Sequence, residues 1–184
     1  MGKSNFSLTN QVAIVTGGGT GIGRSIALEF AEFGADVVVS SRKLENLERV
    51  ADEVKALGRH SLAIKADITK KTDIDNLVQK VMEEFGRIDI LVNNGGVGSK
   101  VLGKPVPIIE VDEDEWDLIM DTNLKGTYFC CQAVGMRMIE NRKGNIINIT
   151  SGDGKRVSGG RGTSYNVAKA GAIMLTQCLA WDFG

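Results

Sequence analysis

Short apolar runs alternate along this chain with longer segments of helical periodicity, and this order constrains the fold more than any other feature. The runs are rich in β-branched residues and too short for helices, whereas the segments between them repeat apolar residues at helical spacing. The predicted strands are Gln11–Thr16, Asp36–Ser41, His60–Lys65, Ile88–Asn93 and Asn145–Thr150. The predicted helices are Gly21–Phe33, Lys43–Leu57, Lys70–Phe85, Asp112–Asp121, Leu124–Asn141 and Thr163–Trp181, with a predicted loop over Gly95–Glu110.

Strands that alternate with helices form a parallel sheet covered by helices on both faces. We therefore predict an α/β protein with a doubly wound parallel sheet in three layers, α/β/α. A chain of 184 residues suits a single domain over residues 1–184. Such sheets bind ligands beyond the carboxyl ends of their strands, so chemistry is expected after Thr16, Ser41, Lys65, Asn93 and Thr150.

Charge and apolar run length exclude several classes of function. The 22 basic and 23 acidic residues nearly cancel, so the chain has no positive field for nucleic acid. No apolar run approaches the roughly 20 residues that a membrane span needs, and the first residues lack the apolar core of a signal peptide. We therefore expect neither nucleic acid nor a membrane as a partner.

The single histidine and the three cysteines remove further possibilities. A metal site built on several histidines cannot form, and a Ser-His-Asp triad would have to use His60, which we interpret as an ordinary strand-end residue. We predict no metal site. Cys130, Cys131 and Cys178 are odd in number and two are adjacent, which does not indicate a disulfide framework. A reducing, cytoplasmic location is therefore expected.

The segment Thr16–Gly23, TGGGTGIG, connects the first predicted strand to the first predicted helix. Glycines there permit a tight turn, and the free N–H groups of a helix N-terminus can hold a pyrophosphate. The nucleoside-triphosphate pattern fails, because Arg24 stands where its lysine is needed, and the strict G-x-G-x-x-G spacing is absent. A turn without a ligand is the remaining alternative to a dinucleotide loop.

The end of the second predicted strand bears on the choice of cofactor. An acidic residue there would hold the adenosine ribose of NAD, but the strand ends Ser40-Ser41-Arg42-Lys43. A guanidinium can instead hold a 2′-phosphate through charge-assisted hydrogen bonds. We therefore predict NADP rather than NAD, bound by Ser41 and Arg42; the alternative is that Arg42 and Lys43 are solvated residues at a helix start.

Tyr165 and Lys169 are four residues apart in a predicted helix and so share one face. An ammonium near a phenol favours the phenolate and eases proton exchange at neutral pH. Ser151, at the end of the last predicted strand, could donate a hydrogen bond to a substrate oxygen. A tyrosine and a lysine at this spacing are common by chance, so the pair alone indicates little.

The full series of motifs is more specific. It comprises TGGGTGIG, Asp67 after the third strand, Asn93-Asn94-Gly95-Gly96 after the fourth, and then Asn123, Ser151, Tyr165 and Lys169. In this order, from about Ser7 to the last residue, the chain resembles the short-chain dehydrogenase/reductase family. The resemblance implies a Rossmann-like fold and an NAD(P)-dependent oxidoreductase.

The resemblance also implies roles. Asn123 would interrupt a helix and hold a water of a proton relay, and Ser151 would orient the substrate carbonyl. Tyr165 would be the acid/base, and Lys169 would make the phenol more acidic and bind the nicotinamide ribose. Ile22 would offer its N–H to the pyrophosphate, Asp67 with Ile68 would contact adenine, and Asn93 would stabilise the central sheet. With the strand-end residues, the candidate cofactor-binding set is Thr16, Gly17, Gly21, Ile22, Gly23, Ser41, Arg42, Asp67, Ile68, Asn93, Gly95, Tyr165 and Lys169.

Three departures from the family pattern stand out. Gly95 replaces the usual alanine, a change expected to be sterically mild and shared with some enoyl-thioester reductases of the family. Ser151 precedes Tyr165 by 14 residues, one more than is usual. Whole members of the family are also longer, so the chain is expected to lack the C-terminal part that supplies further strands and a substrate lid.

The resulting hypothesis is an oxidoreductase that transfers hydride between NADP and a carbonyl or secondary alcohol, such as a 3-oxoacyl thioester or a sugar. The alternatives are an enoyl-thioester reductase of the same family, or a non-catalytic NADP-binding protein. The substrate pocket would include Val97–Glu110 and Gly152–Gly162. The resemblance further implies a homo-oligomer, a dimer or tetramer, paired through Leu124–Asn141 and Thr163–Trp181.

Overall fold

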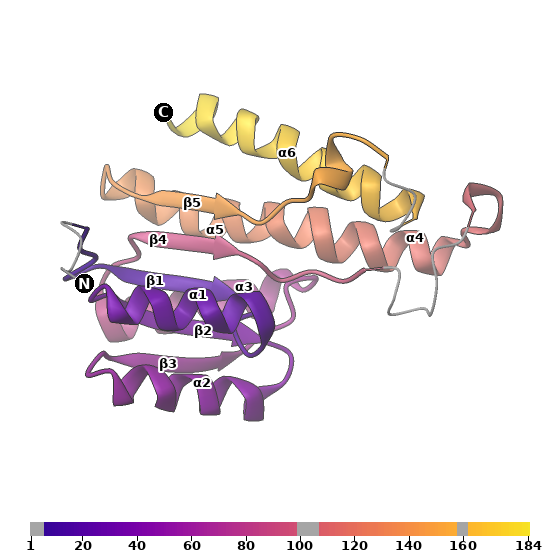
Figure 1. Cartoon of the computed structure of the whole chain (residues 1–184). Helices are drawn as coiled ribbons and strands as arrows, with labels where there is room; N and C mark the ends of the chain where they lie inside the picture. Colours follow the sequence, from indigo (N-terminus) through magenta and orange to yellow (C-terminus); the bar gives the residue numbers. More distant parts are fainter. Residues whose placement is uncertain (1–5, 99–106, 158–161) are drawn as a thin grey trace.

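The computed structural model describes residues 6–98, 107–157 and 162–184, and its centre is a parallel sheet (Figure 1). The strand order is β3-β2-β1-β4-β5, with every pair parallel, which confirms the predicted fold class. The crossover between β3 and β4 reverses the strand order at β1. The strands are β1 (Val12–Thr16), β2 (Asp36–Ser41), β3 (Ser61–Lys65), β4 (Ile90–Asn93) and β5 (Asn145–Asn148).

Helices cover both faces of the sheet. Residues of β1 alternate between two apolar clusters, because successive strand side chains point to opposite faces: Ala13 and Val15 pack with α1 and α2, and Val12 and Ile14 pack with α3 and α5. The α-helices are α1 (Gly21–Glu32), α2 (Leu44–Ala56), α3 (Lys71–Phe85), α4 (Glu113–Met120), α5 (Gly126–Glu140) and α6 (Thr163–Phe183). Shorter helical elements are η2 (Ile108–Glu110), η3 (Asp121–Lys125) and η4 (Gly152–Gly154).

The predicted element ends lie within two residues of the observed ones. Differences of two residues occur at the start of β4 (Ile90 rather than Ile88), the end of β5 (Asn148 rather than Thr150), the start of α5 (Gly126 rather than Leu124) and the end of α6 (Phe183 rather than Trp181). β5 is the last strand of the sheet and its side chains are only partly covered, so its apolar residues do not define the strand end as sharply as those of the central strands. Ser151 therefore lies beyond the strand instead of ending it.

The predicted gap between two helices at Thr122 and Asn123 is wrong. The chain stays helical from α4 into α5 and passes through one π-helical turn, η3. A π turn fits an extra residue into a helix without ending it, which shifts the apolar repeat by one position. The sequence pattern shows that shift as a gap, whereas the backbone remains helical.

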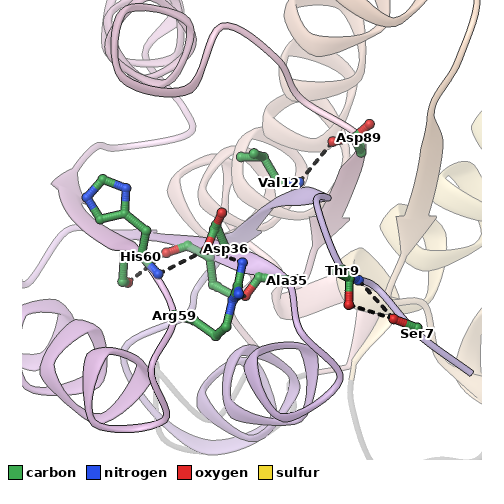
Figure 2. A network of polar contacts seen from close by, with 10 residues as sticks. Ser7, Thr9, Val12, Ala35, Asp36, Arg59, His60 and Asp89 are labelled. Atoms are coloured by element: carbon green, nitrogen blue, oxygen red, sulfur yellow. Dashed lines mark hydrogen bonds and ion pairs between the residues drawn. The ribbon is translucent and has the colours of Figure 1, made fainter.

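A polar network fixes the amino ends of the strands (Figure 2). The carboxylate of Asp36 accepts hydrogen bonds from the Arg59 guanidinium at 2.7 Å and the His60 backbone N–H at 2.9 Å. On the other side of β1, Asp89 accepts the N–H of Val12 at 2.9 Å. His60 thus lies at the end of the sheet opposite the glycine-rich turn that leaves β1, as a strand-end residue.

No helix within the described ranges is long and apolar enough to cross a membrane. The same part of the chain contains no group of three or more His, Cys, Asp or Glu side chains that could hold a metal ion.

Candidate active site

The conformation of the turn between β1 and α1 depends on its glycines, as Gly17 and Gly23 show. Gly17 has a positive φ of 64°, a conformation that residues with a side chain rarely adopt. At Gly23, in the first turn of α1, a Cβ would collide with the carbonyl oxygen of Gly17 and the side-chain amide of Asn94. The turn is therefore folded directly against the start of the helix, with its backbone exposed to the space above the sheet.

The loop after β4 is hydrogen-bonded to this turn. The hydroxyl of Thr16 accepts the N–H of Asn94 at 3.1 Å and that of Gly95 at 3.0 Å. In return, the side-chain nitrogen of Asn94 donates to the carbonyl oxygens of Thr16 and Gly17, at 3.2 and 3.3 Å. Thr16 and Asn94 thus join the turn after β1 to the loop after β4, two segments that are far apart in the sequence.

A cavity of about 520 Å³ opens at the carboxyl ends of β1, β2, β3 and β4. This is the place where a doubly wound sheet binds ligands. Of the predicted cofactor-binding residues, Gly17, Gly21, Ile22, Ser41, Arg42, Asp67, Ile68 and Gly95 line it. The prediction missed the lining residues Gly19, Thr20, Lys43, Asn46, Ala66, Asn94, Gly96, Val97 and Thr122. Most of the missed residues are sequence neighbours of predicted ones, so the strand-end rule itself could have found them.

The remaining predicted cofactor residues do not line the cavity. Thr16 and Gly23 support the turn from beneath. Asn93, nearly fully buried, donates to the side chain of Asn148 at 2.9 Å and to the sulfur of Cys131 at 3.2 Å, so it joins β4 to β5.

Positive charge lies at the β2 end of the cavity. Arg42 and Lys43 are exposed, and within the described residues neither forms an ion pair. Ser41 beside them accepts the N–H of Lys43 at 3.4 Å. The carboxylate of Asp67 also lines the cavity, but it accepts both the N–H and the hydroxyl of Thr69, at 3.1 and 2.9 Å. An anion near β2 would therefore meet unpaired cations.

Asn123 lies in the π turn η3 and is only 1% exposed. Its amide pairs with the backbone of Val97 in both directions: the side-chain nitrogen donates to the carbonyl oxygen at 2.7 Å, and the side-chain oxygen accepts the N–H at 2.9 Å. Its own backbone carbonyl accepts the hydroxyl of Thr127 at 3.1 Å. The π turn is thereby attached to the loop after β4.

Lys169 is buried on α6, and its ammonium donates to the carbonyl oxygen of Ile149 at 2.8 Å. Burial lowers the pKa of Lys169. The ammonium lies 5.8 Å from the centre of the Tyr165 ring, one helical turn away. The expected proximity of the two groups is therefore present, with the amine beside the ring.

Two glycines bring these elements together. A Cβ at Gly96 would lie 2.6 Å from the side-chain oxygen of Asn123 and 3.9 Å from the Lys169 nitrogen. A Cβ at Gly154, in η4, would lie 2.8 Å from the backbone of Lys169. Gly96 also lines the cavity, so the cavity ends beside Asn123 and Lys169.

Ser151 has an extended backbone and immediately precedes η4. Its hydroxyl accepts the N–H of Asp153 at 3.1 Å and lies 3.4 Å from the carboxylate of the same residue. Gly154, in η4, packs against the backbone of Lys169, so the segment that follows Ser151 contacts α6. The predicted substrate loops Val97–Glu110 and Gly152–Gly162 lie in part outside the described residues.

A larger groove of about 740 Å³ runs along the free edge of β5 and the ends of α5 and α6. None of the predicted site residues lines it. Its lining includes Met138, Ile146, Leu179 and Phe183. The candidate site is therefore not the larger of these two cavities. It is distinguished by its position at the carboxyl ends of the strands.

Known proteins that resemble this chain are short-chain dehydrogenases and reductases. The family model described as short chain dehydrogenase matches residues 11–184. The chain is 40% identical over 180 residues to the (2S)-[(R)-hydroxy(phenyl)methyl]succinyl-CoA dehydrogenase subunit BbsD of Thauera aromatica, covering 97% of this chain and 69% of that protein. It is 41% identical over 172 residues to the 3-oxoacyl-[acyl-carrier-protein] reductase FabG of Staphylococcus epidermidis, covering 93% of this chain and 68% of that protein.

Solved structures give the same result. A metagenomic short-chain oxidoreductase in complex with NADP superposes with a TM-score of 0.86 at 35% identity, over 95% of this chain and 77% of that one. A short-chain type dehydrogenase/reductase from Mycobacterium marinum superposes with a TM-score of 0.90 at 32% identity, over 96% of this chain and 70% of that one.

Proposed function

Because the chain belongs to the short-chain dehydrogenase/reductase family of oxidoreductases, we propose that it reduces a carbonyl group with NADPH or oxidises the corresponding alcohol with NADP. The single observation that carries the proposal is the continuity of the cavity. One end meets the free cations Arg42 and Lys43, and the other end reaches Gly96 beside Asn123 and Lys169.

The residues present suit a dinucleotide. At Gly17 and Gly23 the backbone packs closely against its neighbours, and the rest of the turn lines the cavity, where a phosphate group would lie. Thr20, at the N-cap of α1, makes no side-chain hydrogen bond to the helix, so the first N–H groups of α1 remain available. The turn and Ile22 would hold the pyrophosphate, and Asp67 and Ile68 would contact the adenine.

The preference for NADP is supported by the end of β2. The lining residues Ser41, Arg42 and Lys43 offer a hydroxyl, a guanidinium and an ammonium to a 2′-phosphate, and β2 ends without a carboxylate that would repel it. The solved relative in complex with NADP is in line with this preference.

The chemistry is that of proton and hydride exchange at a carbonyl carbon. A bound nicotinamide would supply or accept the hydride. Tyr165 would give its phenolic proton to the carbonyl oxygen, and the Lys169 ammonium beside the ring would stabilise the phenolate that remains. Ser151 would donate a hydrogen bond to the same oxygen. Asn123 would hold the π turn in place, and a relay water would bind at that turn.

The substrate class is proposed from the relatives. One curated relative is named for an acyl-CoA substrate and another for a 3-oxoacyl group on a carrier protein, so we favour a 3-oxoacyl thioester or its 3-hydroxy form. Simple ketones without a thioester serve in the assay as the substrates with which the thioesters are compared.

The test is turnover of NADPH by the purified chain with short 3-oxoacyl-CoA thioesters and a panel of simple ketones. Tyr165→Phe should reduce kcat by about 100-fold or more and leave NADPH binding intact, because it removes only the transferable proton. Equal turnover by Tyr165→Phe would refute the mechanism. Tight NADPH binding with no turnover of any carbonyl would instead identify a cofactor-binding protein without catalysis.

A homo-oligomer, dimer or tetramer, is proposed from the outer surfaces of α5 and α6. These surfaces expose Tyr128, Met136 and Ile139 on α5, and Met174 and Trp181 on α6. Light scattering on the eluted protein should give a multiple of the 19.8 kDa chain mass. Aspartate substitutions at Met136 and Met174 should lower that multiple.

The cysteines support a reducing, cytoplasmic location. All three are free, and Cys178 is exposed. A fluorescent fusion expressed in the source cells should fractionate with the cytoplasm.

A further inference from the structure

Gly95 lies in a tight space between Ile68 and Thr16. A Cβ at Gly95 would lie 3.0 Å from the terminal methyl, Cδ1, of Ile68 and 3.3 Å from the hydroxyl oxygen of Thr16. Carbon atoms in contact lie about 3.5–4.0 Å apart. An alanine at this position would therefore press on Ile68 from one side and on Thr16 from the other.

Ile68 is also restricted on its second side. A Cβ at Gly126, the first residue of α5, would lie 2.9 Å from Cγ1 of Ile68 and 3.0 Å from its carbonyl oxygen. The isoleucine thus packs directly on the backbone of two glycines that belong to different segments. It fills the volume that two methyl groups would otherwise occupy.

Thr16 and Gly126, which lie on either side of the pair, cannot move away easily. The Thr16 hydroxyl is held by the N–H groups of Asn94 and Gly95, and Gly126 is buried in the helix that continues from the π turn. Ile68 is half-buried and lines the 520 Å³ cavity, which is its open side. A methyl group added at Gly95 would require the end of the Ile68 side chain to shift by a few tenths of an ångström, and the open side available to it is that cavity.

We propose that Ile68 and Gly95 are a size-matched pair that sets the width of the cavity where the adenosine part of the dinucleotide binds. Glycine at 95 accommodates the end of the isoleucine side chain without a shift, and the two residues together position the cavity wall. The inference rests on the proposed function, and it adds a specific coupling between two residues that the cofactor role of each does not imply.

The test is a double-mutant cycle with two ligands, NADPH and adenosine 2′,5′-bisphosphate, whose dissociation constants are measured by calorimetry. Gly95→Ala should raise both constants by about tenfold, because the displaced isoleucine narrows the site. Ile68→Val removes only Cδ1 and should raise them by less than about threefold. The double variant should bind within about threefold of the parent, since valine leaves room for the alanine methyl.

Gly126→Ala provides a matched control. Its added methyl would meet Cγ1 and the carbonyl oxygen of Ile68, and valine retains both atoms. Ile68→Val should therefore rescue Gly95→Ala and fail to rescue Gly126→Ala. Urea unfolding of every variant separates a change in the cavity from a general loss of stability.

The outcomes distinguish the two proposals. If the parent binds neither ligand, the proposed function is wrong. If the parent binds both but Gly95→Ala binds equally well, or Ile68→Val does not restore binding, only the size-matched pair is refuted. If Gly95→Ala fails to fold, the double variant still tests the size-matched pair. The proposal then requires that the double variant folds and binds both ligands, and it is refuted if the double variant does not.

Discussion

The ammonium of Lys169 donates to the carbonyl oxygen of Ile149, just beyond β5, while remaining beside the ring of Tyr165. One side chain thus connects the end of the sheet to the face of α6 that carries the candidate acid/base. Because Lys169 is only 7% exposed, it has no freedom to serve as a mobile surface charge.

Replacing this lysine should separate catalysis from stability. Lys169→Met is expected to lower kcat by about 100-fold or more, because the phenolate loses its neighbouring cation. The free energy of unfolding should change by less than about 1.5 kcal/mol, since loss of one hydrogen bond is offset by removal of a buried charge. Urea unfolding and turnover measurements check both parts, and full activity in this variant would contradict the role given to Lys169.

Replacing the Asn123 amide with a carboxyl group of the same shape should destabilise the fold. Asn123→Asp puts an oxygen where the side-chain nitrogen now donates to the carbonyl of Val97, 2.7 Å away. Two acceptors would then face each other in a buried position, at a cost of about 2–4 kcal/mol. Asn76→Asp on the exposed surface of α3 is the control and should change stability by less than about 0.5 kcal/mol. Equal effects of the two substitutions would show that the pairing with Val97 is unimportant.

Asp89 should make stability depend on acid pH. Burial raises the pKa of this carboxyl, but hydrogen bonds from Arg87 and the N–H of Val12 outweigh that effect, so its pKa lies below the usual value. A lowered pKa stabilises the fold above the pKa of the unfolded chain, about 4, and this contribution is lost as the pH falls below that value.

Asp89→Asn measures that contribution. It should cost about 2–3 kcal/mol at neutral pH, because both charge-assisted hydrogen bonds from Arg87 are weakened. The difference from the parent should shrink when unfolding is repeated below about pH 4. A difference that stays constant across this range would contradict the linkage.

The cysteines should divide into two reactivity classes. Burial raises the pKa of Cys130 to about 12 and that of Cys131 to about 11, so neither forms a thiolate near neutral pH. Cys178 is exposed on α6. Mass spectrometry after brief iodoacetamide treatment should show no modification of Cys130 or Cys131 in the native protein, and modification of all three cysteines after unfolding in urea. Rapid labelling of Cys130 in the native protein would argue against the described packing of α5.

The order of elements along the chain was sufficient to predict the sheet, because continuous apolar strands such as β2 and periodic helices such as α2 are unambiguous. The π turn at Asn123 was not predictable from the same pattern, since an inserted helical residue and a helix break look alike in a sequence. The pairing of Asn123 with Val97 depends on packing between segments 26 residues apart.

Sequence motifs also located 8 of the 17 described residues that line the cavity, since the motifs fall at strand ends. They implied that Asn93 stabilises the central sheet beside the cofactor; its side chain joins β4 to β5 and does not line the cavity. The tight fit of Gly95 against Ile68 could not be predicted, because it depends on where a methyl group lies in space and neither residue type reveals it.

The bonds of Thr16 to Gly95, of Asn94 to Gly17 and of Asn123 to Val97 have a practical consequence for redesign. They join the glycine turn after β1 to the loop after β4, and that loop to the π turn at Asn123, so a change in one segment affects the position of the others. Arg42 follows the end of β2 and takes no part in these hydrogen bonds. Exchange of cofactor preference by engineering should therefore begin at Arg42, where the charge can be altered without disturbing the geometry of turnover.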